Sequence, residues 1–414
     1  MSQPRTHIIG AGLAGLSAAV TLAEAGHVVS LHESGPAAGG RCRSYFDRAL
    51  GCRVDNGNHL LLSGNRAAIA YLERIGARET LTGPGTAEFS FMDIASGERW
   101  VLRPNTGRIP WWIFSRARRV PGTRIRDYFG LVSLHQANED TPIAEIARDT
   151  VLYRRLLEPL AIAALNTPPE QALARLLAAV VDETLARGGK ACIPCFPRQG
   201  MSETFIDPAL AWLTARGADI AFNRRITALY IADGRVTALR TTDTTIPLAP
   251  DEKIVLATPP WIAGELLPGL NPPDEFQAIV NVHFRLDTAL PSTFVGLIGG
   301  TAEWVFTKPG HASVTISAAN RLVDDSSDAL AAACWEDVRA ALALPAPMPP
   351  WRVVKERRAT FAATSAQERR RPPARTALRN LALAGDWTAT GLPATIEGAI
   401  RSGRTAAAVL LEAS

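Results

Sequence analysis

The sequence predicts an α/β fold in which a parallel sheet starts near the N-terminus, is interrupted by an α+β region and is completed near the C-terminus. The first observation is a strand, a glycine-rich turn, a helix and a second strand within residues 1–33. The others are two short apolar runs, 254–257 and 381–384, each followed by a turn. Short continuous apolar runs are typical of strands buried on both faces of a parallel sheet.

The N-terminal unit has the order and size of a βαβ motif. Residues 7–9 form a short apolar strand, and Leu13 to Ala25 has helical spacing of its apolar side chains. Gly26 ends this helix, and residues 28–33 form the second strand. The whole unit has the length of about thirty residues expected for βαβ.

The remaining elements follow the same signals of periodicity and turn residues. A capping box with proline, Thr167-Pro168-Pro169-Glu170, predicts the start of a helix that runs to about Arg187. Further predicted elements are a helix at 66–75, strands at 86–103, a helix at 203–216, strands at 219–256 with a turn at Asp233-Gly234, strands at 278–320, and helices at 327–343 and 395–411.

Length and composition fit a globular protein of two interleaved domains. The chain has 414 residues, 47% hydrophobic and 20% charged, so it can bury a sizeable core. The net charge of +4 is too small to indicate nucleic-acid binding. We expect a nucleotide-binding domain at 1–80, 197–262 and 373–414, and a substrate domain with a mixed sheet and helices at 81–196 and 263–372.

The five cysteines do not predict a disulfide framework, because they are few, odd in number and widely spaced. Cys192 and Cys195 have the spacing of a redox dithiol. The alternative, which we favour, is two small apolar residues near a proline-rich turn, since no thioredoxin-like pattern surrounds them. We predict no metal site.

The glycine-rich turn predicts a dinucleotide site. Gly10 makes the tight turn out of the strand, Gly12 lets a pyrophosphate approach the backbone, and Gly15 allows close packing of helix on strand. The helix N-terminus then offers N–H groups to the anion. Glu33 ends the second strand, where it can accept hydrogen bonds from a ribose hydroxyl and would repel a 2′-phosphate.

A second nucleotide-contacting segment favours FAD over NAD. Gly385-Asp386 lies between a buried strand and the last helix, and Gly39-Gly40-Arg41 follows Glu33 closely. A simple NAD dehydrogenase does not need such a return of the C-terminal segment to the nucleotide. The sequence therefore predicts a Rossmann-like FAD-binding domain of the glutathione-reductase and amine-oxidase type.

These motifs, in this order, resemble the flavin amine oxidase and phytoene desaturase superfamily. Within it the chain is most similar to the squalene-associated branch, the hydroxysqualene dehydroxylases of hopanoid-producing bacteria. The residues that carry the resemblance are Gly10-x-Gly12-x-x-Gly15, Glu33, Gly39-Gly40-Arg41, 55–59 (Asp-Asn-Gly-Asn-His), 159–167, Ala257-Thr258-Pro259-Pro260, 279–283, Gly385-Asp386-Trp387 and 392–399.

The resemblance implies which residues bind FAD. The diphosphate would lie on the Gly10–Gly15 loop, the ribose at Glu33 and Ser34, and the adenine beside Ile226. The full set implied to contact the cofactor is Gly10, Ala11, Gly12, Leu13, Ala14, Gly15, Glu33, Ser34, Gly39, Gly40, Arg41, Gly57, Asn58, His59, Ile226, Ala257, Thr258, Gly385, Asp386, Trp387 and Ile396.

The resemblance also implies a reaction. Hydroxysqualene would lose its allylic hydroxyl as water with help from an acid, and the carbon would take a hydride from N5 of reduced flavin. Candidate catalytic residues are His59, with Asp55 and Asn166 after it; their alternatives are a structural group beside FAD, a loop-capping carboxylate and a helix-terminal residue. The strand at 280–284 lacks the lysine expected of amine oxidases, and the nearest lysine along the chain is Lys308.

Residues 103–126 combine arginines with Trp111, Trp112 and Phe114. Arginines with aromatic rings suit a membrane surface; the alternative is a solvated basic loop whose tryptophans lie in the core. We expect a cytoplasmic protein, peripheral on the inner face of the cytoplasmic membrane, that uses a long-chain isoprenoid substrate, a separate electron donor and no nucleic acid. Competing functions are an isoprenoid desaturase, an amine oxidase and a non-catalytic FAD-binding protein.

Overall fold

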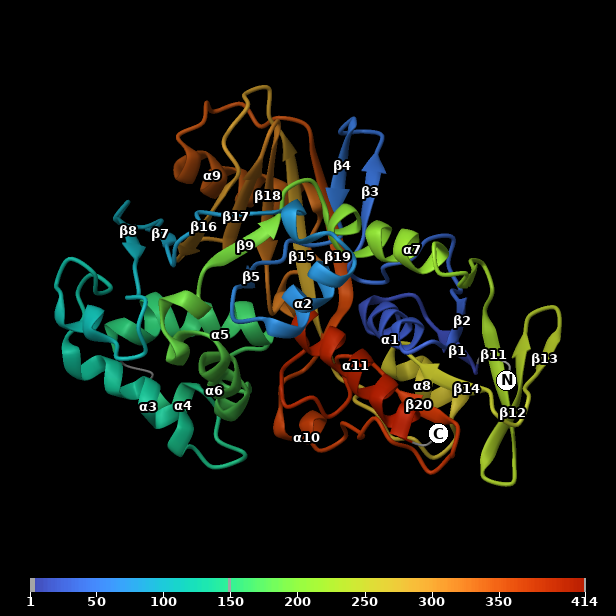
Figure 1. Cartoon of the computed structure of the whole chain (residues 1–414). Helices are drawn as coiled ribbons and strands as arrows, with labels where there is room; N and C mark the ends of the chain where they lie inside the picture. Colours follow the sequence, from blue (N-terminus) through green and yellow to red (C-terminus); the bar gives the residue numbers. More distant parts are fainter. Residues whose placement is uncertain (1–3, 148–149, 413–414) are drawn as a thin grey trace.

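The computed structural model describes residues 4–147 and 150–412. Its first sheet has five parallel strands in the order β10-β2-β1-β14-β20, drawn from widely separated parts of the chain (Figure 1). These strands are β1 (Arg5–Ile9), β2 (Val28–His32), β10 (Asp219–Ala221), β14 (Lys253–Leu256) and β20 (Leu381–Leu383). The interrupted parallel sheet expected from the sequence is therefore confirmed.

Helices cover this sheet and join the two ends of the chain. The first helix, α1, packs along the last, α11, and an added Cβ at Gly403 of α11 would lie 2.2 Å from the carbonyl oxygen of Ala14. Only glycine permits this close approach. The helices here are α1 (Leu13–Glu24), α2 (Arg66–Arg74), α7 (Asp207–Thr214), α8 (Pro260–Leu266) and α11 (Ile396–Glu412).

A three-stranded antiparallel meander extends from this domain, formed by β11 (Ile226–Ala232), β12 (Arg235–Thr241) and β13 (Thr245–Pro247). Its first turn is at Asp233 and Gly234, as expected, and both residues have positive φ. Such a pair is typical of the two-residue turns that match the twist of a hairpin.

The second sheet has seven strands in the order β19-β15-β18-β17-β16-β7-β8, with only the β16–β7 pair parallel among the described residues. Val280, Val282 and Phe284 of β15 pack toward α9 (Ser327–Leu342), whereas the alternate Asn281 and His283 face the FAD-binding side. The strands are β7 (Phe89–Asp93), β8 (Arg99–Leu102), β15 (Phe276–Arg285), β16 (Thr293–Ile298), β17 (Trp304–Lys308), β18 (His311–Ile316) and β19 (Trp351–Phe361).

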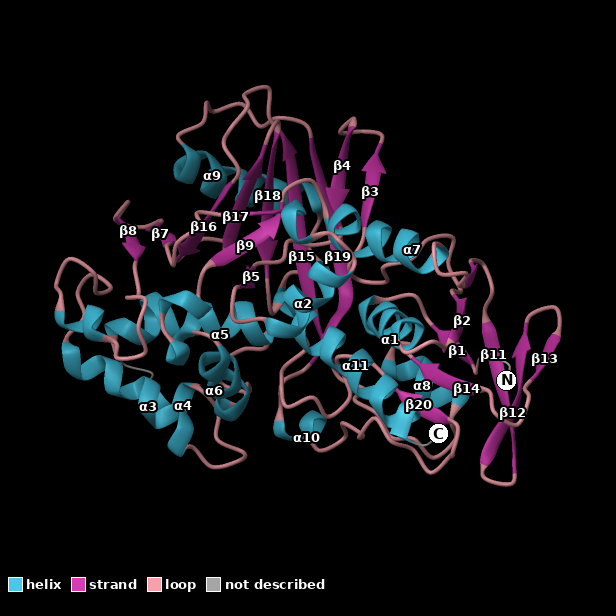
Figure 2. Ribbon diagram, in the orientation of Figure 1, coloured by secondary structure: helices cyan, strands magenta, loops and turns pink. Residues whose placement is uncertain are grey.

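A helical region flanks the second sheet, on the left in Figure 2. It contains α3 (Phe129–Gln136), α4 (Ala144–Ala147), α5 (Glu158–Leu165) and α6 (Ala174–Glu183). Short elements complete the chain: β3 (Ser44–Asp47), β4 (Cys52–Asp55), β5 (Leu61–Leu62), β6 (Leu81–Thr82), β9 (Pro194–Pro197) and α10 (Ser365–Glu368).

The helix predicted from Thr167 to about Arg187 begins too early, since α6 spans Ala174–Glu183; a 3-10 helix, Leu185–Arg187, follows it. Thr167 does not cap α6, because its hydroxyl donates to the Leu165 carbonyl and accepts from the Ala363 N–H. A single turn does form there, because the N–H groups of Gln171 and Ala172 donate to the Pro168 carbonyl, but the extended Leu173 separates this turn from α6.

The two neighbouring tryptophans of the segment 103–126 differ in burial. Trp112 lies in the core at 2% exposure, whereas Trp111 is 51% exposed, so only one of the two tryptophans can meet a membrane.

The Cys192 and Cys195 thiols are both buried and free. Burial raises the pKa of both thiols, that of Cys192 to about 12. A thiol with a raised pKa is a poor nucleophile, which supports the small-apolar alternative over a redox dithiol.

Candidate active site

The glycine-rich turn lies directly after β1, against the end of β14. Gly10 has φ +104°, and a Cβ there would lie 2.7 Å from the Ala257 carbonyl oxygen. A Cβ at Gly15 would lie 2.0 Å from the Gly10 carbonyl oxygen, so both positions need glycine for packing. Gly12 differs, because a Cβ there would meet no atom within 4 Å. Its role is therefore to leave space.

Three features show that this turn fits the diphosphate of FAD. Gly12 is the N-cap of α1, and no side chain caps the helix, so the first N–H groups remain available for an anion. The space over Gly12 is open. The buried Thr258 hydroxyl, in the next loop of the same sheet edge, has no hydrogen-bond partner among the described residues. Buried polar groups are normally paired, so an orphaned hydroxyl at this edge is expected to bind a ligand atom.

Glu33 lies beside the turn as predicted. Its Oε2 accepts the Ala11 N–H at 2.8 Å, and its Oε1 accepts the Gly35 N–H at 2.8 Å, which fixes the carboxylate at the end of β2. The Ser34 hydroxyl also reaches Oε1. The Arg224 N–H donates to the Glu33 carbonyl, so the chain that enters β11 at Ile226 runs alongside. The two segments implied to hold ribose and adenine thus meet.

Arg41 and Asp386 are brought together from opposite ends of the chain. Arg41 Nη2 donates to Asp386 Oδ1 at 2.7 Å, and its Nη1 donates to the Ala359 carbonyl of β19. The Gly39 N–H donates to the Ala11 carbonyl, which holds the Gly39–Gly40 segment against the phosphate turn. The second nucleotide-contacting segment therefore does return to the first, as the FAD prediction required.

The other C-terminal residues support this edge from behind. The Gly385 N–H donates to the Ser402 hydroxyl of α11. Trp387 is buried, and its indole N–H donates to the Thr258 carbonyl at 3.0 Å, so it contacts the site through that segment. Ile396 is the first residue of α11 and is buried in the core of the FAD-binding domain.

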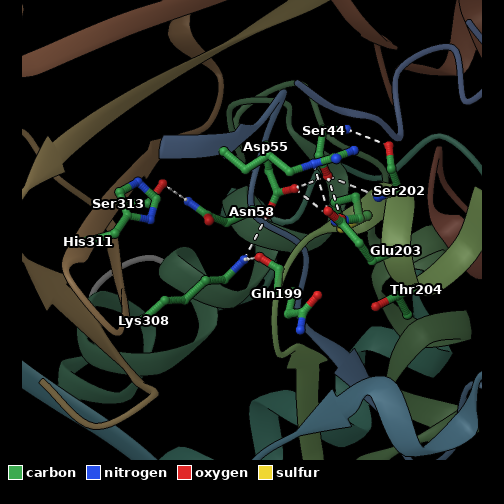
Figure 3. Close-up of polar contacts among 12 residues, drawn as sticks. Ser44, Asp55, Asn58, Gln199, Ser202, Glu203, Thr204, Lys308, His311 and Ser313 are labelled. Carbon is green, nitrogen blue, oxygen red and sulfur yellow. Dashed lines mark hydrogen bonds and ion pairs between the residues drawn. The ribbon is translucent and has the colours of Figure 1, made fainter. Parts of the chain in front are cut away.

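The segment 55–59 crosses from the first domain onto the second sheet (Figure 3). Asp55 Oδ2 accepts Lys308 Nζ at 2.8 Å, and Asp55 Oδ1 accepts the Ser44 hydroxyl and the Met201 N–H. Burial alone would raise the pKa of Asp55, but the charge and hydrogen bond of Lys308, with the bonds from Ser44 and Met201, lower it below its usual value. Asp55 is therefore ionised at neutral pH.

Asn58 continues this contact. Its Nδ2 donates to the hydroxyls of Ser313 and Thr315 on β18. Asn281 Nδ2 donates to the Asn56 carbonyl, and the Asn281 side chain also faces the Gly57 backbone. Asn281 lies on β15, the strand in which an amine oxidase is expected to carry its lysine. Ser313 and Thr315 are site residues that sequence motifs do not predict, although their alternation with buried apolar residues on β18 indicates that they share one face.

His59 and Asn166 take different positions. Burial lowers the pKa of His59 to about 4, against the raising effect of Asp55, so its imidazole is neutral at pH 7.

Asn166 ends α5 in the left-handed conformation, with φ 49°. Its amide N–H groups donate to the Gln277 carbonyl and the Thr360 hydroxyl, and its oxygen accepts the Ala318 N–H. Asn166 thus joins α5 to the second sheet.

The sequence and structure were compared with known proteins. Residues 13–411 match the family model of flavin containing amine oxidoreductases. The hydroxysqualene dehydroxylase of Zymomonas mobilis is 46% identical over 411 residues, 99% of each chain, and that of Rhodopseudomonas palustris is 49% identical with 98% of each chain covered.

Solved structures show the same fold at low identity. A putrescine oxidase variant has a TM-score of 0.73 at 14% identity, covering 99% of this chain and 100% of its own. Cyclohexylamine oxidase from Brevibacterium oxydans has a TM-score of 0.65 at 16% identity, covering 99% of each chain. The chain therefore belongs to the hydroxysqualene dehydroxylase family of the flavin-containing amine oxidoreductases, and it is an FAD-dependent oxidoreductase.

Proposed function

We propose that this chain catalyses the reductive dehydroxylation of hydroxysqualene to squalene in bacterial squalene and hopanoid biosynthesis. The observation that carries the proposal is the full-length likeness, at 46–49% identity, to three proteins named for this reaction. Leu60, the residue after His59, packs against a buried aromatic cluster of Phe196, Phe294 and Phe306, which excludes water from that side of the 55–59 segment.

The chain's own residues hold and orient the reactants. Gly12, the α1 N-terminus and Thr258 would bind the diphosphate of FAD, and Arg41 with Asp386 would line its phosphate and ribityl region. Reduced FAD would supply the hydride that replaces the hydroxyl. Asp55, ionised and bonded to Lys308, is proposed as the residue that positions the 55–59 loop rather than as an acid.

His59 is proposed to lie beside the flavin as a neutral imidazole. A neutral histidine can orient a hydroxyl or a flavin edge by a hydrogen bond without carrying the proton that leaves with water. We expect His59→Ala to lower turnover. Unchanged turnover of bound hydroxysqualene would remove His59 from the proposed catalytic residues.

The experiment that tests the function is an anaerobic single turnover. Photoreduced enzyme is mixed with hydroxysqualene while the flavin spectrum and the extracted products are followed. The proposal predicts flavin reoxidation with formation of squalene. Reduction of oxidised flavin by a polyene precursor or an amine would instead indicate a desaturase or an amine oxidase, and an unreactive flavin would indicate a non-catalytic role.

The electrons are proposed to come from a separate donor or from NAD(P)H that binds transiently, since the sequence has no second GxGxxG loop. Anaerobic addition of NADH or NADPH to the purified enzyme tests this. Rapid bleaching of the flavin would favour direct reduction by the nicotinamide. Slow or absent bleaching would favour a protein donor.

We also propose that part of the segment 103–126, with the adjacent start of α3, contacts an anionic membrane surface from the cytoplasmic side. Large apolar side chains are exposed here at Ile109, Trp111, Phe114, Ile125 and Phe129. The arginine at 118 packs over the Trp111 ring at 4.7 Å, and further arginines at 108, 116, 124 and 126 are exposed nearby. No helix among the described residues combines the length and hydrophobicity needed to cross a bilayer.

Co-sedimentation with vesicles of anionic lipid tests this surface. The informative variant is Trp111→Ser with Phe114→Ser, because Trp112 lies in the core and its loss would damage folding. We expect weaker binding by this variant and by high salt, since exposed rings and arginines would both contribute. A Phe46→Ser variant, altered at an exposed ring elsewhere, is the matched control. Equal binding by all three proteins would refute the membrane contact.

A further inference from the structure

A cleft of about 150 Å³ lies between one end of the second sheet and the helical region. Most of its wall is apolar, and Glu303, the residue before β17, contributes a carboxylic acid from the sheet side. The other charged groups that line it, Arg154 and Glu158, come from the helical side. Residues that line the cleft include Phe91, Glu158, Ile162, Leu297, Glu303 and Trp304.

Glu303 is held in place on one side. Its Oε2 accepts the Ser317 N–H at 2.7 Å, so the carboxyl group is anchored to the chain that follows β18. The positive charge of Arg321, also beyond β18, faces it as well. Burial raises the pKa of Glu303 to about 7, which outweighs the lowering effects of the Ser317 hydrogen bonds and of Arg321. A carboxylic acid of this kind can hold a proton at neutral pH and release it on demand.

The cleft is next to the segment implied to lie beside the flavin. Trp304, the residue after Glu303, is paired across the sheet with Thr315, whose hydroxyl accepts a hydrogen bond from Asn58. Cross-strand partners share a face of the sheet, so Trp304 and the Asn58 contact lie on the same face. The Trp304 ring also packs on Phe294, at 6.1 Å, and on Phe91 at 5.7 Å. Trp304 therefore connects the buried aromatic cluster that Leu60 contacts with the wall of the cleft.

We propose that Glu303 is the general acid of the dehydroxylation, and that the cleft binds the alcohol-bearing part of an isoprenoid allylic alcohol. This inference rests on the proposed function. The Glu303 carboxyl proton passes to the hydroxyl oxygen, the C–O bond breaks, and water leaves. The allylic carbon gains a hydride from the reduced flavin, which is oxidised by two electrons. The Glu303 carboxylate then regains a proton from solvent.

Glu303 fits this step better than the three residues named from the sequence. Asp55 is ionised and shared among three donors. His59 is neutral at pH 7, and the polar atoms of Asn166 are bonded to other parts of the chain. Glu303 combines a proton at neutral pH, an apolar cleft and a fixed position. General acid catalysis needs a proton to donate and a position within reach of the leaving oxygen, and the apolar cleft suits the substrate.

The test uses the FAD-loaded full-length enzyme and the variant Glu303→Gln. Glutamine keeps the size and an oxygen that can accept the Ser317 N–H, but it has no acidic proton. We expect turnover of hydroxysqualene to fall about 100-fold or more. In the wild type, turnover should fall as pH rises through about 7, because the acid loses its proton, and this limb should be absent from the variant. Glu336→Gln, on the exposed face of α9, is the matched control and should behave as wild type.

Two measurements without turnover complete the test. A protonated carboxylic acid has its own infrared carbonyl band, and we expect one that titrates near pH 7 and is lost in Glu303→Gln. The intrinsic tryptophan fluorescence should respond to bound hydroxysqualene in both proteins, because the variant keeps the cleft that Trp304 lines.

The outcomes separate the inference from the function. If wild-type enzyme forms no squalene, the proposed function fails. If wild type forms squalene but Glu303→Gln is equally fast with the same pH profile, Glu303 is not the acid and the function stands. A variant that loses activity while the wild-type pH limb lies far from 7 would also overturn the assignment.

Discussion

The contact between Lys308 and Asp55 joins the second sheet to the 55–59 loop, and its removal should have a large effect. Both side chains are mostly buried, with 12% and 6% of their surface exposed, and their charged atoms are 2.8 Å apart. Lys308→Met would leave the Asp55 carboxylate in the protein interior with only Ser44 and Met201 as donors. Loss of one partner of a buried pair costs about 3–5 kcal/mol. For a chain of this size, unfolding as one unit, that is a fall in Tm of about 3–6 °C.

The pH dependence identifies the cause. In the wild type the pKa of Asp55 is lowered, so its stabilising contribution is present above the unfolded pKa and is lost as pH falls through the folded one. Without Lys308, burial dominates and the pKa of Asp55 rises. The variant must then ionise a buried acid as pH rises, so its deficit in Tm relative to wild type should be larger at pH 8 than at pH 5.

Thermal denaturation of the FAD-loaded proteins at the two pH values measures this. Lys355→Met is the matched control, because that lysine lies on β19 of the same sheet and donates to the Asp325 carbonyl at the surface. Adding Asp55→Asn to Lys308→Met should recover part of the loss at pH 8, since the double variant buries no unpaired charge. A deficit below about 1 kcal/mol, or one equal at pH 5 and pH 8, would refute this account of the contact.

Three further variants test other parts of the site. Gly12→Val should leave the thermal stability of the cofactor-free protein nearly unchanged and abolish FAD binding, measured by flavin absorbance after dialysis with FAD, because its side chain fills the open space over the loop; yellow Gly12→Val protein would contradict the site. Gly10→Ala should instead destabilise the fold itself, seen as a lower Tm of the cofactor-free protein, since its Cβ would lie 2.7 Å from the Ala257 oxygen. Asn166→Ala should cost about 1–3 kcal/mol in chemical denaturation, because buried donors and acceptors lose their partner, while kcat at saturating substrate stays within about threefold; a large fall in kcat at unchanged stability would give Asn166 a catalytic role.

The FAD-binding half was predictable because its signals are local. The turn from Gly10 to Gly15, the strand before it and Glu33 lie within one βαβ unit, so spacing alone relates them in space. The sequence predicts that the segments of Arg41 and Asp386 both lie at the nucleotide. It does not predict their 2.7 Å contact, because the segments are far apart in the chain and meet where α11 packs along α1.

Where the sequence failed, long-range contacts overrode a local signal. A capping box and two prolines at 167–170 predicted a helix start, and one turn forms on Pro168, but the extended Leu173 interrupts it and donates its N–H to the Ala363 carbonyl. Trp111 and Trp112 are neighbours in the sequence, yet one is exposed and the other buried, because consecutive residues of a tight turn point in different directions. Composition cannot distinguish them.

The catalytic acid shows why a site of this kind is not readable from one sequence. The sequence favours His59 over Glu303 as an acid, because histidine ordinarily titrates near neutral pH and glutamate ordinarily titrates near 4. Burial reverses this order: it lowers the pKa of His59 to about 4 and raises that of Glu303 to about 7. Desolvation disfavours the charged form of either group, so it moves a base and an acid in opposite directions. The burial of each group, and not its ordinary pKa, therefore decides which side chain can hold a proton at pH 7.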